Sequence, residues 1–110
     1  MSADPLQPQK CSDLLAALAA PERLRVVRLL AEKPHNVTEI TKALGIAPLN
    51  VSHHLTVLKA ANLIHGAKRG RFVIYSLVEG VLAQVEQAGQ PCEAINLGCC
   101  CVTLPKAPGD

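Results

Sequence analysis

The chain has 110 residues with 11 Lys and Arg, 9 Asp and Glu, and a net charge of +2, so it allows one compact domain and is too short for two. This charge does not by itself indicate a nucleic-acid partner, because affinity for phosphate depends on local clusters of Lys and Arg. Phe72 and Tyr75 are the only Phe, Tyr or Trp residues. This argues against a protein that binds single-stranded nucleic acid by stacking bases on aromatic side chains.

The chemistry expected of the five cysteines depends on the cellular compartment, because the compartment sets their redox state. No run of residues approaches the length needed to span a bilayer, and the opening MSADPLQPQK lacks the apolar core of a secretory signal. We therefore expect a cytoplasmic protein without a membrane partner. Cytosolic thiols are kept reduced, so an odd number of cysteines indicates ligands or redox sensors rather than a disulfide framework.

The N-terminal part predicts a tail and two helices. Residues 1–10 contain two prolines and predict a flexible tail. The next segment, CSDLLAALAA, is helical in pattern with Ser12 as N-cap. Pro21 opens a second helix, PERLRVVRLLAE, in which the apolar face turns inward. The residues expected on its outward face are Arg23, Arg25 and Arg28.

Two further helices predict a helix-turn-helix. Asn36 and Glu39 have the spacing of a capping box, and Gly45 supplies a left-handed stop. Pro48 then opens a longer helix. Two short helices joined by a tight turn that contains glycine are typical of this DNA-binding motif.

The second helix of the motif has one apolar and one polar face. Val51, Leu55 and Leu58 point one way. The opposite face can reach base edges and phosphates from the major groove, although a merely solvated face has the same pattern. The residues expected to contact DNA from this helix are Asn50, Ser52, His53, Thr56 and Lys59.

A hairpin follows the motif. Residues 63–65 and 72–77 are rich in β-forming residues, and Gly70 lies where a tight turn needs positive φ. Its tip carries a cluster of cations suited to phosphates or a narrow minor groove. These are Lys68, Arg69 and Arg71. A basic hairpin directly after a helix-turn-helix predicts a wing.

Residues 78–90 return to helical spacing. Val78, Val81, Leu82 and Val85 recur at i, i+3, i+4 and i+7. We expect this stripe to form the seam of a homodimer, the alternative being that it packs within its own subunit. Residues 91–110 contain Pro, Gly and Cys without a clear period, which predicts a loop or a short strand.

The predicted fold is mostly α with a small β-hairpin: a winged helix-turn-helix that forms a homodimer. Its divisions are a tail at 1–10, a DNA-binding and dimerisation domain at 11–90, and a cysteine-rich sensing tail at 91–110. Two such motifs related by a two-fold axis would read two half-sites of a palindromic double-stranded operator.

The chain resembles the ArsR/SmtB family of winged-helix metalloregulatory repressors. The resemblance is carried by LAAPERLRVVRLL, by VTEITKALGIAPLNVSHHLTVLKAANLI and by KRGRFVIYSL, and the run from Val51 to Leu55 is particularly diagnostic. It implies a homodimer joined through its first and last helices, a recognition helix at Leu49 to Ala61, and repression relieved by an inducer. Asn62 stands where the family often has glycine, and asparagine also tolerates left-handed geometry.

The inducer sites that the resemblance suggests are absent. Val37, Thr38 and Glu39 replace the cysteine-containing element of the arsenic-sensing type. The final segment lacks the paired ligands of the zinc-sensing type, since the corresponding residues are Gly80, Gln84 and Gln87.

The C-terminal cysteines are the remaining candidates. We expect the metal ligands to be Cys92, Cys99, Cys100 and Cys101, and we place Cys11 second to them. An extended tail would put Cys99 and Cys101 on one face. Soft thiolates favour soft acceptors. Three of them suit As(III) or Sb(III) as inducer, and Cys11 as a fourth would suit Cd(II) or Zn(II).

Three alternatives remain open for the thiols. Cysteines also serve as small hydrophobes. A repressor of the same fold could sense oxidants or reactive sulfur through disulfides. A thiol metal carrier, with the winged helix mediating protein contacts, is a more remote possibility. No sequence motif pairs a cysteine with a general base, and no phosphate-binding loop or carboxylate pair occurs, so we do not expect the protein to be an enzyme.

Overall fold

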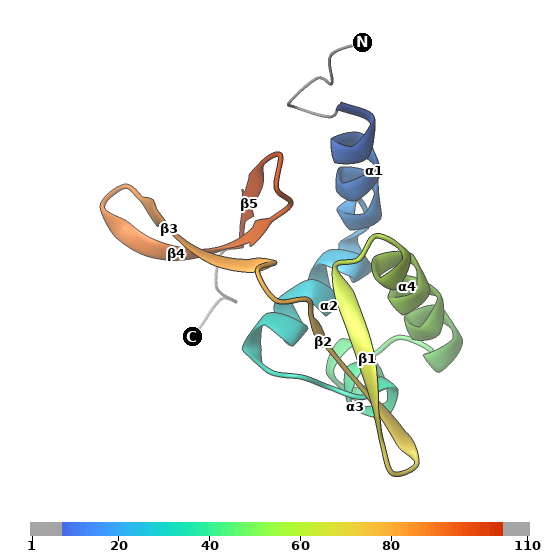
Figure 1. The fold of residues 1–110 in the computed structure, drawn as a ribbon. Helices are drawn as coiled ribbons and strands as arrows, with labels where there is room; N and C mark the ends of the chain where they lie inside the picture. Colours follow the sequence, from blue (N-terminus) through green and yellow to red (C-terminus); the bar gives the residue numbers. More distant parts are fainter. Residues whose placement is uncertain (1–7, 105–110) are drawn as a thin grey trace.

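The structure is a computed structural model that describes residues 8–104, with four helices followed by five strands (Figure 1). The helices are α1 (Pro8–Leu18), α2 (Pro21–Glu32), α3 (Val37–Leu44) and α4 (Pro48–Ala60). The strands are β1 (Ile64–Arg69), β2 (Phe72–Leu77), β3 (Leu82–Gln87), β4 (Gln90–Asn96) and β5 (Cys101–Thr103). No helix in this described part is long and apolar enough to cross a bilayer.

The core lies between the helices and the base of the first hairpin. Val26 and Val27 of α2, Ile40 of α3 and Val51 and Leu58 of α4 are completely buried. With Leu30 on α2 and Leu55 on α4, which are also buried, the core residues of these two helices recur at spacings of three and four and so lie on one face of each, as the sequence predicts. The core fixes α3 and α4 against α2, so the polar face of α4 is held outward by packing.

The helix-turn-helix is confirmed in detail. The Asn36 side chain accepts a hydrogen bond from the Glu39 amide at 2.8 Å, and the Glu39 carboxylate accepts one from the Asn36 amide at 2.9 Å. Gly45 ends α3 with φ of 69°. Asn62, just beyond α4, has φ of 60°, so the left-handed geometry expected of it is present.

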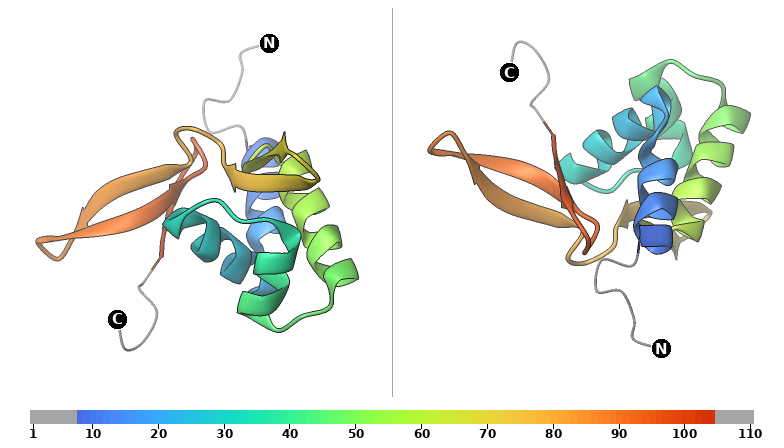
Figure 2. Two further views of the ribbon diagram at one scale, coloured as in Figure 1. Left: turned by 90° about the horizontal axis from the view of Figure 1, so that it is seen from below. Right: turned by 90° about the horizontal axis from the view of Figure 1, so that it is seen from above.

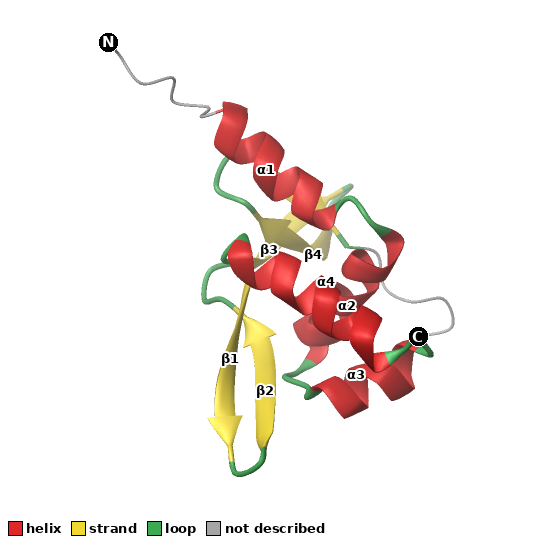
Figure 3. Cartoon of the chain, turned by 90° about the vertical axis from the view of Figure 1, so that its right-hand side faces the viewer, coloured by secondary structure: helices red, strands yellow, loops and turns green. Residues whose placement is uncertain are grey.

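The wing is an antiparallel pair whose register runs from Ile64 opposite Leu77 to Arg69 opposite Phe72. Its first strand continues to Arg69 instead of ending at residue 65, and Gly70, with φ of 62°, lies in the turn. His35 exchanges backbone hydrogen bonds with Tyr75 of β2 at 3.0 and 2.8 Å. This bridge anchors the base of the wing, while its tip projects beyond the helices (Figure 3).

The predicted helix over residues 78–90 is wrong, because this segment contains β3 and the turn into β4. Ala88 and Gly89 have φ of 53° and 78°, the positive values that a two-residue type I′ hairpin turn requires at both central positions. Val81 and Val85 are apolar at a period of two as well as at helical spacing, so the pattern alone did not separate the two structures. Pro91 also disfavours a helix that continues past this point.

The expected dimer seam is therefore also wrong as a helical stripe. Val81 is only 7% exposed, and Val78 and Leu82 pack with it against the subunit's own core. No final helix follows the wing within residues 78–104. A dimer joined through its first and last helices, as the resemblance implies, cannot use a last helix from this described segment.

The C-terminal part forms a second sheet with the order β3-β4-β5. Ala94 and Ile95 of β4, the central strand, are completely buried, so this end of the sheet packs against the core. The distal ends of β3 and β4 project away from the helices (Figure 2). The expected loop or short strand from residue 91 is thus β4 as far as Asn96, a loop at residues 97–100 and the short strand β5, and residues 105–110 lie outside the described part.

The N-terminus differs from the prediction as well. α1 begins at Pro8, so Ser12 is inside the helix and does not cap it. Proline is favoured in the first turn of a helix because its missing N–H has no partner there in any case. Residues 8–10 of the predicted tail are therefore helical, and residues 1–7 lie outside the described part.

Candidate functional site

The outward face of α4 has the properties of a DNA-reading surface. The five side chains expected to contact DNA are all exposed: Asn50, Ser52, His53, Thr56 and Lys59. The Thr56 hydroxyl donates to the Ser52 carbonyl at 2.9 Å, so its lone pairs remain available to accept from a base or from water. Leu49, which is outside the set predicted from the sequence, is 80% exposed at the start of α4 and offers an apolar contact for a thymine methyl group.

The wing presents the three expected cations. Lys68, Arg69 and Arg71 are all exposed at or next to the turn. Phe72 is 47% exposed and Val73 39% exposed beside them. Long cationic side chains on a narrow projection can reach phosphates flanking the groove that α4 would enter.

Arg23 joins three helices instead of pointing outward into solvent. Its Nε donates to the Ala17 carbonyl at the end of α1, and its Nη2 donates to the Ala16 carbonyl at 3.4 Å. Its Nη1 lies 3.3 Å from Nδ1 of His54 on α4. A guanidinium can only donate, so the neutral imidazole accepts. Arg23 therefore links the C-terminus of α1 to α4.

The position of His54 beside Arg23 affects its pKa. Burial and then the Arg23 charge lower the pKa of His54 from its ordinary value of 6.5, although the Glu22 carboxylate opposes the shift. Both main causes disfavour the imidazolium. The uncharged form that accepts from Arg23 is thus the stable one.

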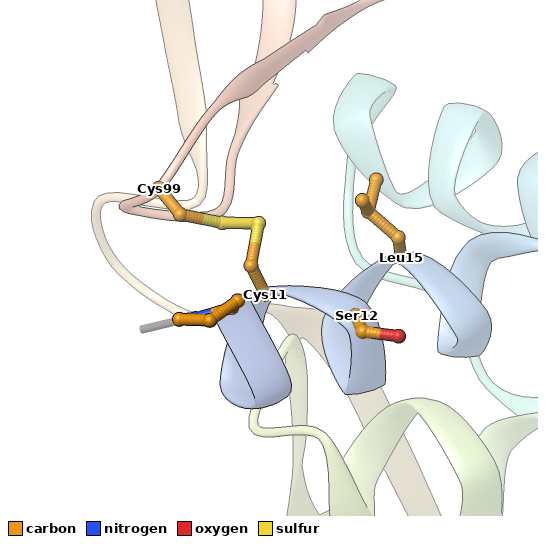
Figure 4. A pocket seen from close by; sticks show the side chains of 5 residues that line it. Cys11, Ser12, Leu15 and Cys99 are labelled. Carbon is orange, nitrogen blue, oxygen red and sulfur yellow. A yellow bond between two sulfur atoms is a disulfide. The ribbon is translucent and has the colours of Figure 1, made fainter. Parts of the chain in front are cut away.

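Three sulfur atoms converge between α1 and the C-terminal sheet. Cys11 and Cys99 are joined by a disulfide (Figure 4). Cys100 Sγ lies 4.0 Å from Cys11 Sγ and 3.9 Å from Cys99 Sγ. All three residues are half-buried, and their sulfurs lie within 4.8 Å of one another. We call these three residues the thiol cluster.

The loop between β4 and β5 positions two members of the cluster. Gly98 has φ of 88°, and its amide donates to the Asn96 side chain at 2.9 Å. The Leu97 amide donates to the Cys100 carbonyl at 2.9 Å, and Leu97 is buried in the core. The loop is therefore fixed by hydrogen bonds and packing, and it turns Cys99 and Cys100 toward α1.

The other two expected ligands lie elsewhere. Cys92 Sγ contacts the Glu93 carbonyl at 3.4 Å, and Cys101 Sγ contacts Asn96 Oδ1 at 3.9 Å. Neither belongs to the thiol cluster. Cys99 precedes β5 and Cys101 begins it, so the two do not form the same-face pair expected of an extended tail. Cys11, which we expected to be a less favoured ligand than the C-terminal cysteines, is the third member of the cluster instead.

Two of the sulfur spacings in the thiol cluster are close to those of thiolates that share one metal ion. Thiolates bound to one zinc at about 2.3 Å with tetrahedral angles are about 3.8 Å apart. The two distances from the Cys100 sulfur, 4.0 and 3.9 Å, are close to this value. Opening the disulfide would let Cys11 and Cys99 separate to a similar distance. The same three sulfurs can thus exist as a disulfide plus a thiol or as three thiolates around one ion.

A cavity of about 430 Å³ adjoins the cluster. Its lining comes from the first two turns of α1 and from the β4–β5 loop (Figure 4). The lining residues are Pro8, Cys11, Ser12, Leu15 and Cys99. The first four recur at i, i+3, i+4 and i+7, so they form one stripe along the helix.

Comparison with known proteins identifies the same DNA-binding region. Residues 20–65 match the family described as "Bacterial regulatory protein, arsR family". NmtR, an HTH-type transcriptional regulator of Mycobacterium tuberculosis, is 38% identical over 85 residues, which cover 76% of this chain and 71% of NmtR. The HTH-type transcriptional repressor SmtB of the same organism is 42% identical over 73 residues, or 66% of this chain and 54% of SmtB.

Solved structures agree with these relatives. The homodimeric winged helix-turn-helix domain of Mb0332 from Mycobacterium bovis, described as a possible ArsR-family transcriptional regulator, superposes with a TM-score of 0.63 at 26% identity. That match covers 69% of this chain and 72% of the Mb0332 chain. The order of helices and wing, the matched residues and the similarity to NmtR lead to one conclusion: the chain belongs to the ArsR family of winged-helix DNA-binding transcriptional regulators.

Proposed function

We propose that the protein is a homodimeric repressor that leaves its operator when a soft metal(loid), As(III) or Sb(III) in preference to Cd(II) or Zn(II), binds the thiol cluster. The observation that carries this proposal is the convergence of Cys11 with Cys99 and Cys100, which are 88 and 89 residues away in sequence. Three sulfurs within 4.8 Å and no hard ligand in that group favour a soft acceptor.

Binding of arsenite is an exchange of ligands without change of oxidation state. As(OH)₃ reacts with three thiols to give As(S-Cys)₃ and three waters, so three As–O bonds break, three As–S bonds form, and each thiol proton leaves with a hydroxide. The reaction needs all three residues reduced. A fourth donor would be needed for tetrahedral Zn(II) or Cd(II), and the described cluster supplies three.

The DNA-binding half of the proposal rests on α4 and the wing. The exposed polar face of α4 enters the major groove and the basic wing tip contacts flanking phosphates. One such motif has little affinity, whereas two related by a two-fold axis read palindromic half-sites about 34 Å apart. The homodimeric state of Mb0332 supports this assembly for the present chain.

Arg23 provides a physical route from the cluster to DNA. Ligation ties the β4–β5 loop to α1 through Cys11, and the far end of α1 is hydrogen-bonded to Arg23. Arg23 in turn contacts His54, which adjoins His53 on the DNA-reading helix. A shift of α1 would therefore change how α4 is presented. Coupling of about 1–3 kcal/mol would weaken operator binding about 5- to 150-fold.

The test is fluorescence anisotropy of labelled DNA from upstream of the protein's own gene, with fully reduced protein. Wild-type protein should bind this DNA and release it on addition of arsenite. The variant with Cys11, Cys99 and Cys100 changed to serine should bind the DNA equally well and ignore arsenite. The matched control, Cys92→Ser with Cys101→Ser, should respond as wild type does. A response that disappears only in the control variant would place the sensor at Cys92 and Cys101 and overturn the proposal.

A second candidate function is sensing of oxidants by the same cluster. The Cys11–Cys99 disulfide favours it, since a disulfide between α1 and the β4–β5 loop joins the same two elements as a bound metal(loid). Two thiols would give up two electrons and two protons to a peroxide, which is reduced to water and an alcohol or to two waters. Release of operator DNA by peroxide, with no response of reduced protein to arsenite, would favour this function over the first.

A further inference from the structure

We infer that Leu49 contacts the 5-methyl group of one thymine in each operator half-site and thereby sets the base preference at that position. This inference rests on the DNA-binding half of the proposed function and adds a specificity-determining residue to the polar side chains of α4. A homodimer carries two copies of α4, so it would read two such thymines, related by the two-fold axis of the operator.

Leu49 is far more exposed than the other large apolar side chains on the surface. It is 80% exposed, whereas Leu15, Phe72 and Val73 are between 39% and 47% exposed. Within residues 8–104, it belongs neither to the core cluster nor to the apolar residues that pack against that cluster. A single leucine on a protein surface is common and needs no partner. Its place on α4 therefore decides whether it is a contact residue.

Leu49 lies at the middle of the outward face of α4. Because the helix has about 3.6 residues per turn, Leu49, His53 and Thr56 recur at i, i+4 and i+7 and share one stripe. Val51 and Leu58, which are completely buried, lie on the opposite side of the helix. The resemblance joins the dimer through the first and last helices, so α4 is not part of that contact. The outward face of α4 therefore stays available to DNA in the dimer.

The position of Leu49 along α4 is as important as the face on which it lies. α4 begins at Pro48, so Leu49 is its second residue. In helix-turn-helix proteins, the N-terminal residues of the recognition helix contact base edges in the major groove. Val51, two residues later, is completely buried and holds this end of the helix against the core. Leu49 is therefore placed where a side chain can touch a base.

Thymine is the base that offers an apolar group to such a side chain. In the major groove it presents its O4 acceptor and its 5-methyl group, whereas the other three bases present hydrogen-bond donors and acceptors. Leucine has no polar side-chain atom. At another base it would cover a donor or an acceptor without replacing the hydrogen bond to water, whereas contact with the methyl group removes apolar surface of both partners from water. The chemistry of Leu49 thus selects thymine.

The test replaces each thymine of the upstream operator DNA in turn with deoxyuridine, which lacks only the 5-methyl group. Affinity for the reduced full-length protein is measured by fluorescence anisotropy. Replacement of the contacted thymine should weaken wild-type binding about fourfold in one half-site and about fifteenfold in both, as expected for one and two buried methyl groups. The two sensitive thymines should be symmetric about the centre of the operator, and replacement of the other thymines should have little effect.

Three variants assign this sensitivity to a residue. Leu49→Gln should bind thymine and deoxyuridine operators equally well, because an amide replaces the apolar end of the side chain, whereas Leu49→Met should keep the discrimination. Lys59→Gln, at an exposed position in the last turn of α4, is the matched control. It should weaken binding to both operators alike and keep the wild-type ratio of the two affinities. Because Leu49 is outside the core, its variants should keep the wild-type melting temperature.

The outcomes separate this inference from the proposed function. If the wild-type protein binds the operator but no thymine replacement weakens binding, the inference is overturned, while operator binding and its release by arsenite stand. If the sensitivity to deoxyuridine persists in Leu49→Gln, another residue contacts the methyl group, which also overturns the inference. If the wild-type protein binds the upstream DNA no more tightly than unrelated DNA, both the inference and the DNA-binding half of the proposed function fail.

Discussion

Reduction of the Cys11–Cys99 disulfide should lower the free energy of unfolding by about 4–5 kcal/mol. The disulfide joins residues 88 apart, so it removes a large loop-closure entropy from the unfolded chain. The loop-entropy relation gives about 15 cal/mol/K for a loop of this length, or about 4.6 kcal/mol at 25 °C. With an unfolding entropy of about 2.1 cal/mol/K per residue over 110 residues, this corresponds to a fall in melting temperature of about 20 °C.

The assay is guanidinium unfolding followed by circular dichroism, with oxidised and dithiothreitol-reduced protein at one fixed concentration, since the stability of a dimer depends on concentration. The variant Cys92→Ser with Cys101→Ser should retain the difference between the two states. Cys11→Ser should remove it. After removal of the reductant, arsenite at 100 times its dissociation constant should restore about 2.7 kcal/mol to the reduced wild-type protein.

Two results would refute this reasoning. Equal unfolding midpoints for the oxidised and reduced wild-type protein would show that no long-range cross-link forms. A midpoint that still depends on reductant in Cys11→Ser would show that the cross-link joins other cysteines.

Three further predictions concern charge and coupling. The pKa of His54 is lowered below 6.5 in the folded protein, so His54 takes up a proton in the unfolded chain at a higher pH than in the folded one. The contribution of His54 to the free energy of unfolding is therefore fully present above pH 6.5 and is lost as the pH falls below it. His54→Gln should make the melting temperature less dependent on pH in this range. Replacing the wing cations Lys68, Arg69 and Arg71 by glutamine should weaken binding to all DNA sequences alike. In filter-binding assays, the slope of the logarithm of the binding constant against the logarithm of salt concentration should become less steep by about 0.9 for each phosphate that is no longer neutralised. Arg23→Met should leave the affinity for arsenite unchanged but reduce the release of operator DNA that arsenite causes, measured by anisotropy. Release equal to that of the wild-type protein would exclude Arg23 from the coupling.

The helices and the wing between residues 11 and 77 could be predicted because their signals are local. The Asn36 and Glu39 capping pair, the Gly45 stop and the apolar faces of α2 and α4 each act within a few residues. Residues 78–90 could not be assigned in this way, since their apolar positions fit both a helical period and a period of two. The deciding features were the turn at Ala88–Gly89 and pairing with β4, and such pairing is not visible in one segment alone.

The thiol site could be predicted only in part for the same reason. The cysteine block at residues 99–101 was evident in the sequence and supplies two members of the cluster. Cys11 lies 88 residues before Cys99, and nothing near it in sequence indicates a ligand. Its part in the cluster depends on how the C-terminal sheet packs beside α1. Similarly, the spacing in α2 placed Arg23 outward but gave no sign of its contacts with α1 and His54.

The most direct test of the account is the number of sulfur neighbours of arsenic in the reduced, arsenite-loaded protein, measured by X-ray absorption at the arsenic edge. We expect three sulfurs in the wild-type protein, three in the variant Cys92→Ser with Cys101→Ser, and two in Cys11→Ser. Three sulfurs retained in Cys11→Ser, together with fewer than three in the Cys92 and Cys101 double variant, would contradict it, because the ligands would then come from the C-terminal segment without α1.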